Sequence, residues 1–219
     1  QNGSSDFGGG MYNASSSPIL INCTFTGNSA HRGGGMYNTD SGDPILTNCV
    51  FASNSADEDG GGMFNIYSSS PTLIGCTFAS NSVTDLFSRG GGMSNFNDSS
   101  PALTNCAFTN NSADSGGGMW NDNSSSPTLD DCTLCSNASG QITGTYEDLG
   151  GNCIRLVCAD GDGDGVPDCE NVSTDLELSV PDEYASIELA MDAAAPGAVI
   201  DIAAGTYTPS LTLDTLGKA

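Results

Sequence analysis

The stretch GGGMYNASSSPILINCTFTGNS, residues 8–29, decides the fold, because close variants of it return four more times. Its methionine recurs at Met11, Met36, Met63, Met93 and Met119, with spacings of 25, 27, 30 and 26 residues. A block of constant length follows each time, starting at Pro18, Pro44, Pro71, Pro101 and Pro127. Only the stretches before the prolines and before the glycines vary in length. Fixed segments joined by variable loops predict a stack of structural repeats.

Three short segments make up one repeat, and in the first copy they end at Asn13, Asn22 and Asn28. The residues at the second of these corners are Asn22, Asn48, Gly75, Asn105 and Asp131. Asn, Gly and Asp tolerate left-handed backbone angles, where a β-branched residue would be strained. We therefore expect a tight left-handed turn at this corner of every repeat.

The recurring apolar residues occupy alternate positions along these segments. In the first copy they are Met11, Leu20, Cys23 and Phe25. A helix would need apolar residues every 3.6 positions, and so much Gly, Pro, Asn and Ser does not support one. We expect a triangular coil in which each strand pairs in parallel with its equivalent about 4.8 Å away. Like residues then stack in ladders, with Met on Met, Leu on Leu, Phe on Phe and Asn on Asn.

The pattern GGGM[YF]N…NCTF..NSA resembles the right-handed parallel β-helix repeats of bacterial secreted and surface proteins. Those proteins are similar in shape to pectin lyases and in motif to polymorphic outer-membrane proteins. The resemblance covers residues 7–155. It implies an all-β fold, with a right-handed parallel β-helix over residues 1–158, and an extracellular or cell-surface location.

The nine cysteines fall into two groups. Five occupy one ladder position: Cys23, Cys49, Cys76, Cys106 and Cys132. Neighbours in a ladder lie about 4.8 Å apart with parallel side chains, which is wider than a disulfide needs, so we expect buried free thiols. The other four, Cys135, Cys153, Cys158 and Cys169, allow two disulfides in any of three connectivities.

We expect these four to form the pairs Cys135–Cys153 and Cys158–Cys169, which would indicate an oxidising compartment. A zinc site is the alternative, although the paired C-x-x-C motifs typical of zinc sites are missing.

Residues 160–171, DGDGDGVPDCEN, predict a calcium loop, because hard oxygen ligands at alternate positions of a tight turn suit Ca²⁺. The candidate ligands are Asp160, Asp162, Asp164, the backbone carbonyl of Val166, Asp168 and Asn171. An EF-hand loop would carry glutamate at the last position. The segment resembles thrombospondin type 3 and dockerin-like loops, which implies a Ca²⁺-binding connector over residues 159–179. A solvated acidic linker is the alternative.

The composition changes again over residues 180–219, where Ile187, Ala190, Met191 and Ala194 follow helical spacing. Residues 198–207, AVIDIAAGTY, then predict a strand that includes Val199, Ile200 and Ile202. This helix-plus-strand module resembles the beginning of many β-helix proteins, where a short helix covers the open end of the first coil.

The sequence begins within a coil, at a position where Phe7 and Met11 would be left uncovered. We therefore expect the module of one copy to dock on the first coil of the next copy by strand addition. A heterologous contact of this kind propagates into a filament. The expected function is thus structural, in an extracellular filament or surface fibre made of copies of this chain. The alternative is that the sequence is cut from a longer tandem array.

The charge argues against two classes of partner. The chain has 27 acidic and 4 basic residues and a net charge of −23. It lacks the clustered Lys and Arg that grip a phosphate backbone, and anionic membrane surfaces would repel it. No apolar run reaches the roughly 18 residues of a membrane span. We expect neither nucleic-acid binding nor membrane insertion.

No catalytic constellation stands out, although β-helices include polysaccharide lyases and hydrolases. Arg32, Arg89 and Arg155 fall in what we interpret as unrelated loops, and His31, the single histidine, has no evident partner. The acidic run 57–59 lies in a stretch of variable length, which we interpret as solvated charge. We therefore expect no enzymatic activity, and a polysaccharide lyase or hydrolase is the less favoured alternative.

An outward row of aromatic residues follows the methionines at Tyr12, Tyr37, Phe64 and Trp120, with Ser94 interrupting it. Cross-strand stacking is the expected use of this row. The alternative is a carbohydrate-stacking strip, which would make the protein a surface adhesin or glycan-binding module.

Overall fold

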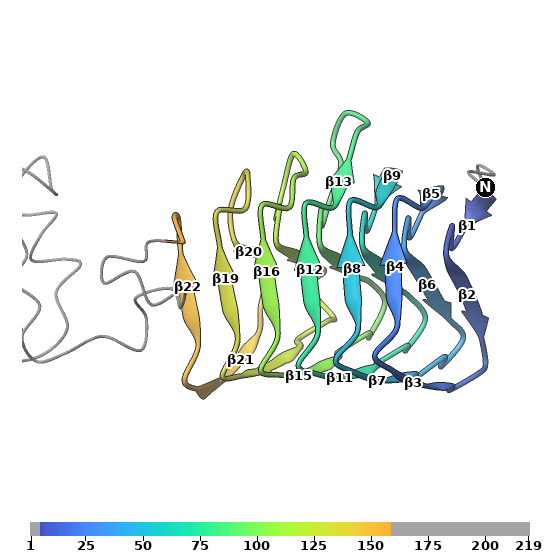
Figure 1. Ribbon diagram of the computed structural model, residues 1–219, viewed down its shortest axis with the longest axis horizontal. Coiled ribbons are helices and arrows are strands. Elements are labelled where there is room, and N and C mark those ends of the chain that lie inside the picture. The colour runs from blue at the N-terminus through green and yellow to red at the C-terminus, as the bar shows by residue number, and fades with distance from the viewer. Residues whose placement is uncertain (1–4, 159–219) are drawn as a thin grey trace, which may run out of the picture. The chain divides into compact units, whose positions relative to one another are not determined.

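The computed structural model describes residues 5–158 of the 219-residue chain, and these form 22 strands and no helix. The strands build four sheets, A to D, that run along a single stack (Figure 1). Sheet A contains β1 (Ser5–Phe7), β5 (Ser29–Arg32), β9 (Ser55–Asp59) and β13 (Ser82–Val83). Sheet B contains β2 (Met11–Ala14), β6 (Met36–Thr39), β10 (Met63–Asn65), β14 (Met93–Asn95), β17 (Met119–Asn121) and β20 (Ile142–Thr143).

The other two sheets contain six strands each. Sheet C contains β3 (Ile19–Ile21), β7 (Ile45–Thr47), β11 (Thr72–Ile74), β15 (Ala102–Thr104), β18 (Thr128–Asp130) and β21 (Glu147–Gly150). Sheet D contains β4 (Thr24–Thr26), β8 (Val50–Ala52), β12 (Thr77–Ala79), β16 (Ala107–Thr109), β19 (Thr133–Cys135) and β22 (Cys153–Arg155).

Every strand pairs in parallel with its equivalent one repeat away. Met36, for example, is the register partner of Met11 on one side and of Met63 on the other. One repeat therefore forms one turn of the stack, which we call a rung, and the predicted parallel coil with its ladders is confirmed.

The rungs in the first part of the stack have four sides, not the three that we expected, because sheet A adds a fourth side. The residues before each glycine run form sheet A, and isolated parallel bridges extend it from Ser82 to Ser112 and from Ser112 to Ala138. The glycines make the sharp corner between sheets A and B. Gly60 has a φ of 65°, and a Cβ on Gly62 would lie 2.5 Å from the carbonyl oxygen of Gly92. The backbones of neighbouring rungs thus approach too closely here for any side chain.

The core inside the stack consists of the predicted ladders of Met, Leu, Cys and Phe side chains. Phe51 and Phe78 are fully buried, and the ring centroids along the ladder of Phe25, Phe51, Phe78 and Phe108 lie 4.5–4.7 Å apart. The five ladder cysteines are free thiols, as the spacing predicted. The second corner also has the predicted left-handed backbone, with φ of 54° at Asn22, 51° at Asn48, 62° at Gly75, 52° at Asn105 and 50° at Asp131.

Two ladders of buried asparagines hold the corners on either side of the core. In the first, the side-chain amide of each residue donates to the carbonyl oxygen of the next at 2.8 Å, along Asn13, Asn38, Asn65, Asn95 and Asn121. The second ladder consists of Asn28, Asn54, Asn81, Asn111 and Asn137. The Oδ1 of each member after Asn28 accepts two hydrogen bonds from the asparagine of the preceding rung, one from its backbone N–H and one from its side-chain amide.

The structure corrects the expected disulfide pairing. Cys135 is bonded to Cys158, with their Cα atoms 5.1 Å apart, which rules out both Cys135–Cys153 and Cys158–Cys169. The register explains the error, because Cys153 pairs with Thr133 and Cys135 pairs with Arg155. Cys153 is therefore two residues along the strand from the level of Cys135, although it too is disulfide-bonded. Cys169 lies outside the described residues.

The second asparagine ladder predicts the cost of interrupting it. We expect Asn81→Ala to lower the free energy of unfolding by about 3 kcal/mol, because the buried N–H and amide of Asn54 lose their acceptor and Phe51 loses a donor to its carbonyl. The exposed Asn123→Ala is the matched control, with an expected change within about 0.5 kcal/mol. Urea denaturation measures both variants, and equal losses would contradict a stabilising role for the ladder.

Candidate functional site

The first candidate site is the N-terminal rung, residues 5–28, whose strands β1, β2, β3 and β4 each lie at the edge of a sheet. Its side chains are less covered than their equivalents one rung further on. Met11 is partly buried whereas Met36 is fully buried, and Ile19 and Ile21 on β3 are 67% and 60% exposed. The predicted contact residues Phe7 and Met11 both belong to this rung, and Phe7 is 40% exposed.

The backbone of β3 faces away from the stack at two positions. In β7, Ile45 donates its N–H to the Pro18 carbonyl and the Thr47 carbonyl accepts the N–H of Asn22, so both residues point their backbone groups toward β3. Their register partners Ile19 and Ile21 point the same way, which is away from β7. No described strand pairs with that edge. The rung therefore presents backbone donors and acceptors to a further strand.

The asparagine ladders end at the same rung with unmatched acceptors. Asn13 is 6% exposed, and no described residue donates to its Oδ1, although this atom is not fully buried. The Oδ1 of Asn28 likewise receives no donor from residues 5–158. At the opposite end, Asn121 donates to the Thr145 carbonyl at 2.9 Å and Asn137 donates to Oε1 of Gln141. The last donors of the ladders are thus satisfied by described residues, whereas residues 5–158 provide no donor for the first acceptors.

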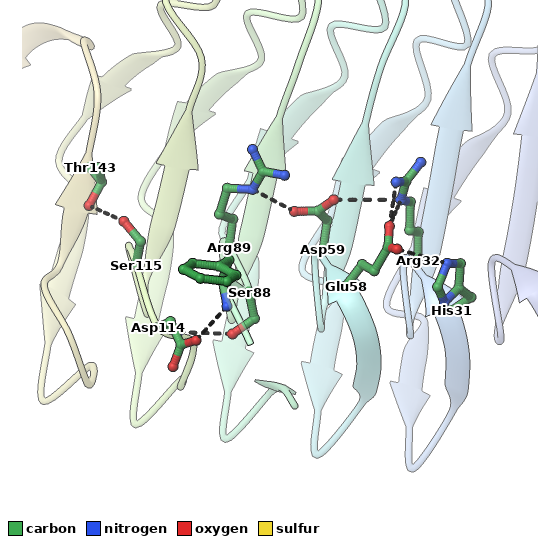
Figure 2. A network of polar contacts seen from close by, with 10 residues as sticks. His31, Arg32, Glu58, Asp59, Ser88, Arg89, Asp114, Ser115 and Thr143 are labelled. Atoms are coloured by element: carbon green, nitrogen blue, oxygen red, sulfur yellow. Dashed lines mark hydrogen bonds and ion pairs between the residues drawn. The ribbon is translucent and has the colours of Figure 1, made fainter. Parts of the chain in front are cut away.

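The second candidate site is a row of charged residues on sheet A, shown in Figure 2, which we call the charge row and which consists of Arg32, Asp59 and Arg89. Asp59 lies between two arginines, with its Oδ1 3.1 Å from Nε of Arg89 and its Oδ2 3.5 Å from Nε of Arg32. Its side chain is only 3% exposed. The interpretation of Arg32 and Arg89 as residues of unrelated loops was therefore wrong. Each residue of the row directly precedes a glycine run, and aligning the repeats on the glycines would have revealed it.

Glu58 and His31 lie beside the charge row and are more exposed than Asp59. The Oε2 of Glu58 accepts hydrogen bonds from Nε of Arg32, at 2.8 Å, and from the terminal guanidinium nitrogen. His31 lies against two carboxylates, with Nε2 3.3 Å from Glu58 and Nδ1 3.6 Å from Asp57. The acidic run is thus part of strand β9 with defined partners, and not the solvated loop that we expected.

The two carboxylates respond to their surroundings in opposite directions. Burial is the largest influence on the pKa of Asp59 and raises it above the usual 3.8, although Arg89 and Arg32 act to lower it. Burial also acts to raise the pKa of Glu58. There, however, the hydrogen bond and charge of Arg32, together with His31 and Arg89, outweigh burial and hold the pKa below 4.5.

The aromatic residues outside sheet B form a ladder of their own. Ring centroids are 4.9 Å apart for Phe7 and Tyr37, 5.4 Å for Tyr12 and Tyr37, 5.3 Å for Tyr37 and Phe64, 5.3 Å for Phe64 and Phe96, and 4.5 Å for Phe96 and Trp120. Phe96 had not been predicted as a member. It bridges the gap at Ser94, whose buried Oγ has no hydrogen-bond partner among the described residues.

The charge row covers part of this aromatic ladder. The guanidinium carbon of Arg89 lies 4.8 Å from the Phe96 ring centre and 4.9 Å from that of Trp120. Tyr37 and Phe64 are buried, with exposed fractions of 7% and 1%. Stacking therefore accounts for the row, as predicted, and at these positions the ring faces are not open to a sugar.

The sequence model of the family described as "Right handed beta helix region" matches residues 9–155. The chain belongs to the right-handed β-helix family. No curated protein and no solved structure matches the chain.

The remaining predictions for this β-helix are not tested by its described part. Within residues 5–158, no group of three or more His, Cys, Asp or Glu side chains is arranged to hold a metal ion. Among the same residues there is no helix with the length and apolarity to cross a membrane. The predicted calcium ligands, residues 160–171, and the predicted docking residues, 187–202, lie outside the described part.

The opposite pKa shifts predict opposite pH profiles. A raised pKa contributes stability at low pH that is lost as the pH rises through it, and a lowered pKa does the reverse. Between about pH 3 and pH 7, the stability of the wild type relative to Asp59→Asn should therefore fall, and its stability relative to Glu58→Gln should increase. Urea midpoints across this range measure both, and parallel profiles would contradict the assignment.

Proposed function

We propose that this β-helix is a structural protein of an extracellular filament or surface fibre in which copies stack head to tail. The observation that carries the proposal is the N-terminal rung. It combines outward backbone groups on β3, exposed Ile19 and Ile21, and two ladder acceptors without donors among the described residues. One further strand-bearing segment would address all three features at once, because it would pair with β3, cover the isoleucines and bring donors to the two acceptors.

The proposed occupant is the module of residues 180–219 of a neighbouring copy. Its strand would pair with β3, and its apolar residues would cover Met11 and Leu20, which are only partly buried. Residues 180–219 contain neither Asn nor Gln, so the donors for Asn13 and Asn28 would be backbone N–H groups, hydroxyls such as that of Thr206, or the ammonium of Lys218. The docked segment would therefore end the asparagine ladders without continuing them.

We propose a structural role, and no catalytic one, for the charge row. Both carboxylate oxygens of Asp59 are engaged by arginines, and Arg89 is stacked on two aromatic rings. A surface adhesin or glycan-binding module is the second candidate, and the exposed rings of Tyr12 and Tyr67 favour it, with exposed fractions of 52% and 54%. A glycan array distinguishes it from the fibre, because a purely structural protein would bind no glycan.

The filament proposal predicts the effect of two changes. Deletion of residues 180–219 should abolish head-to-tail assembly, and Ile21→Pro should do the same by removing an outward N–H from β3. Ile21→Val, which keeps this N–H, should still assemble. Electron microscopy and sedimentation velocity report the outcome. Fibres that persist after the deletion would overturn the proposal, as would equal behaviour of the proline and valine variants.

The acidic connector is proposed to bind Ca²⁺ and to stiffen the link between the rungs and the module. We expect Asp162→Asn together with Asp164→Asn to abolish the binding of Ca²⁺ seen by isothermal titration calorimetry. Asp85→Asn, an exposed carboxylate in the loop after β13, is the control and should leave the binding unchanged. A wild-type chain that takes up no Ca²⁺ would show the segment to be a solvated linker.

A further inference from the structure

A column of five thiols runs through the interior of the stack. This thiol column comprises Cys23, Cys49, Cys76, Cys106 and Cys132, which are all free. Four of them are buried, and Cys23 at the N-terminal rung is partly exposed. The backbone register holds through the column. The residue after each cysteine donates its N–H to the carbonyl of the cysteine one rung earlier, as Val50 does to Cys23 and Thr77 does to Cys49.

The thiols of the column occupy equivalent positions in successive rungs, and their hydrogen-bond partners are weak. The neighbouring thiol of Cys106 is the largest influence on the pKa of Cys76 and of Cys132 and lowers both. Besides this, each sulfur contacts backbone carbonyls, as Sγ of Cys49 does at 3.6 Å from Leu20 and 3.5 Å from Thr47. A thiol is a weak donor, so displacing these contacts costs little.

The spacing of the column matches the geometry of a linear two-coordinate metal complex. The phenyl rings two residues further along are 4.5–4.7 Å apart from rung to rung. Two metal–thiolate bonds of about 2.3 Å, placed end to end, span about 4.6 Å. A disulfide, in contrast, would need sulfur atoms about 2 Å apart. The parallel stacking that keeps the thiols from pairing thus leaves a gap of the size that one bridging ion fills.

We propose that the outer pair, Cys23 and Cys49, binds one soft divalent ion, Hg²⁺, as a linear dithiolate. Each sulfur gives up its proton to solvent, two metal–sulfur bonds form, and no electron is transferred. The two thiolates cancel the charge of the ion, so the complex is neutral. Its surroundings are the ladders of Leu20, Phe25 and their equivalents, in which a net charge would be costly. A monovalent ion such as Cu⁺ or Ag⁺ would leave a buried anion and bind more weakly.

The open side of the N-terminal rung provides the entry. Cys23 is the only member of the thiol column with an exposed surface, whereas Cys49 lies one rung inside and is fully buried. The ion therefore binds Cys23 first and then Cys49, and the inner thiols are reached only through the outer pair.

The test is a titration of the full chain with Hg²⁺ in the presence of excess glutathione, followed by the ultraviolet charge-transfer absorbance of mercury–thiolate bonds. We expect one equivalent to be retained against glutathione and the thermal midpoint to rise, because the ion joins two rungs. Cys23→Ala and Cys49→Ala should each abolish the retained absorbance. Cys132→Ala, at the other end of the column, is the matched control and should retain it.

The two outer variants separate the bridge from simpler binding. If a single thiol captured the ion, Cys49→Ala would still retain it, and the proposal would be wrong. If the ion bound to carboxylates, Cys23→Ala would retain it as well, since this variant keeps all 27 acidic residues. Circular dichroism establishes that each variant is folded, and Cys23→Ala, which changes a partly exposed residue at the end of the stack, is the safer of the two. X-ray absorption should show two sulfur ligands per ion.

Discussion

The in-register parallel pairing of equivalent residues, one rung apart, is the constraint on which the rest of the structure depends. It places each side chain beside the residue at the same position of the neighbouring rung, so one residue type can fill a position in every rung only if it is compatible with a copy of itself. Phenyl rings stack, and amides both donate and accept, which explains the ladders through Phe51 and Asn81. Charged side chains fail this condition, since like charges directly opposite repel each other. On sheet A the sequence accordingly changes sign from Arg32 to Asp59 to Arg89, which are successive pairing partners.

The same condition explains which parts of the structure were predictable from the sequence. The core ladders and the left-handed corner belong to the block of constant length, where repeats can be aligned by eye and each position has one physical requirement. Sheet A lies in the variable stretch, so its pairing partners shift in sequence and Asp59 was taken for solvated charge. Its register is still fixed, because the glycines at one end of the stretch are themselves in register.

Two further features depended on contacts that no periodicity encodes. Phe96 occupies the place in its repeat that Ile66 occupies in the preceding one, and its ring closes the aromatic ladder beside Ser94 from an adjacent position. The Cys135–Cys158 disulfide depends on the path of the chain after β22, where the Cys158 N–H donates to the hydroxyl of Ser136. The sequence limited the pairing to a few connectivities, and only the register of β19 with β22 could choose among them.

The asparagine ladders give the stack a direction. Every hydrogen bond from one ladder asparagine to the next runs toward the later rung, so the first rung offers acceptors, while Thr145 and Gln141 accept from the last asparagines. Two N-terminal rungs placed face to face would bring acceptor against acceptor, at Asn13 and at Asn28, and leave them unpaired. An isologous dimer through this face is therefore disfavoured, and a donor-bearing segment of different sequence is favoured, which is the requirement for assembly that does not close.

The two proposals share one opening. A segment that adds a strand to β3 and covers Met11 would also bury Cys23, much as the N-terminal rung covers Cys49. A neighbouring copy and a soft metal ion therefore compete for the N-terminal rung, although they use different atoms: backbone groups and amide acceptors in one case, sulfur in the other. Because the backbone edge and the thiol column end at the same rung, covering one closes access to the other. The exposure of a single thiol, Cys23, thus reports whether the end of the stack is free.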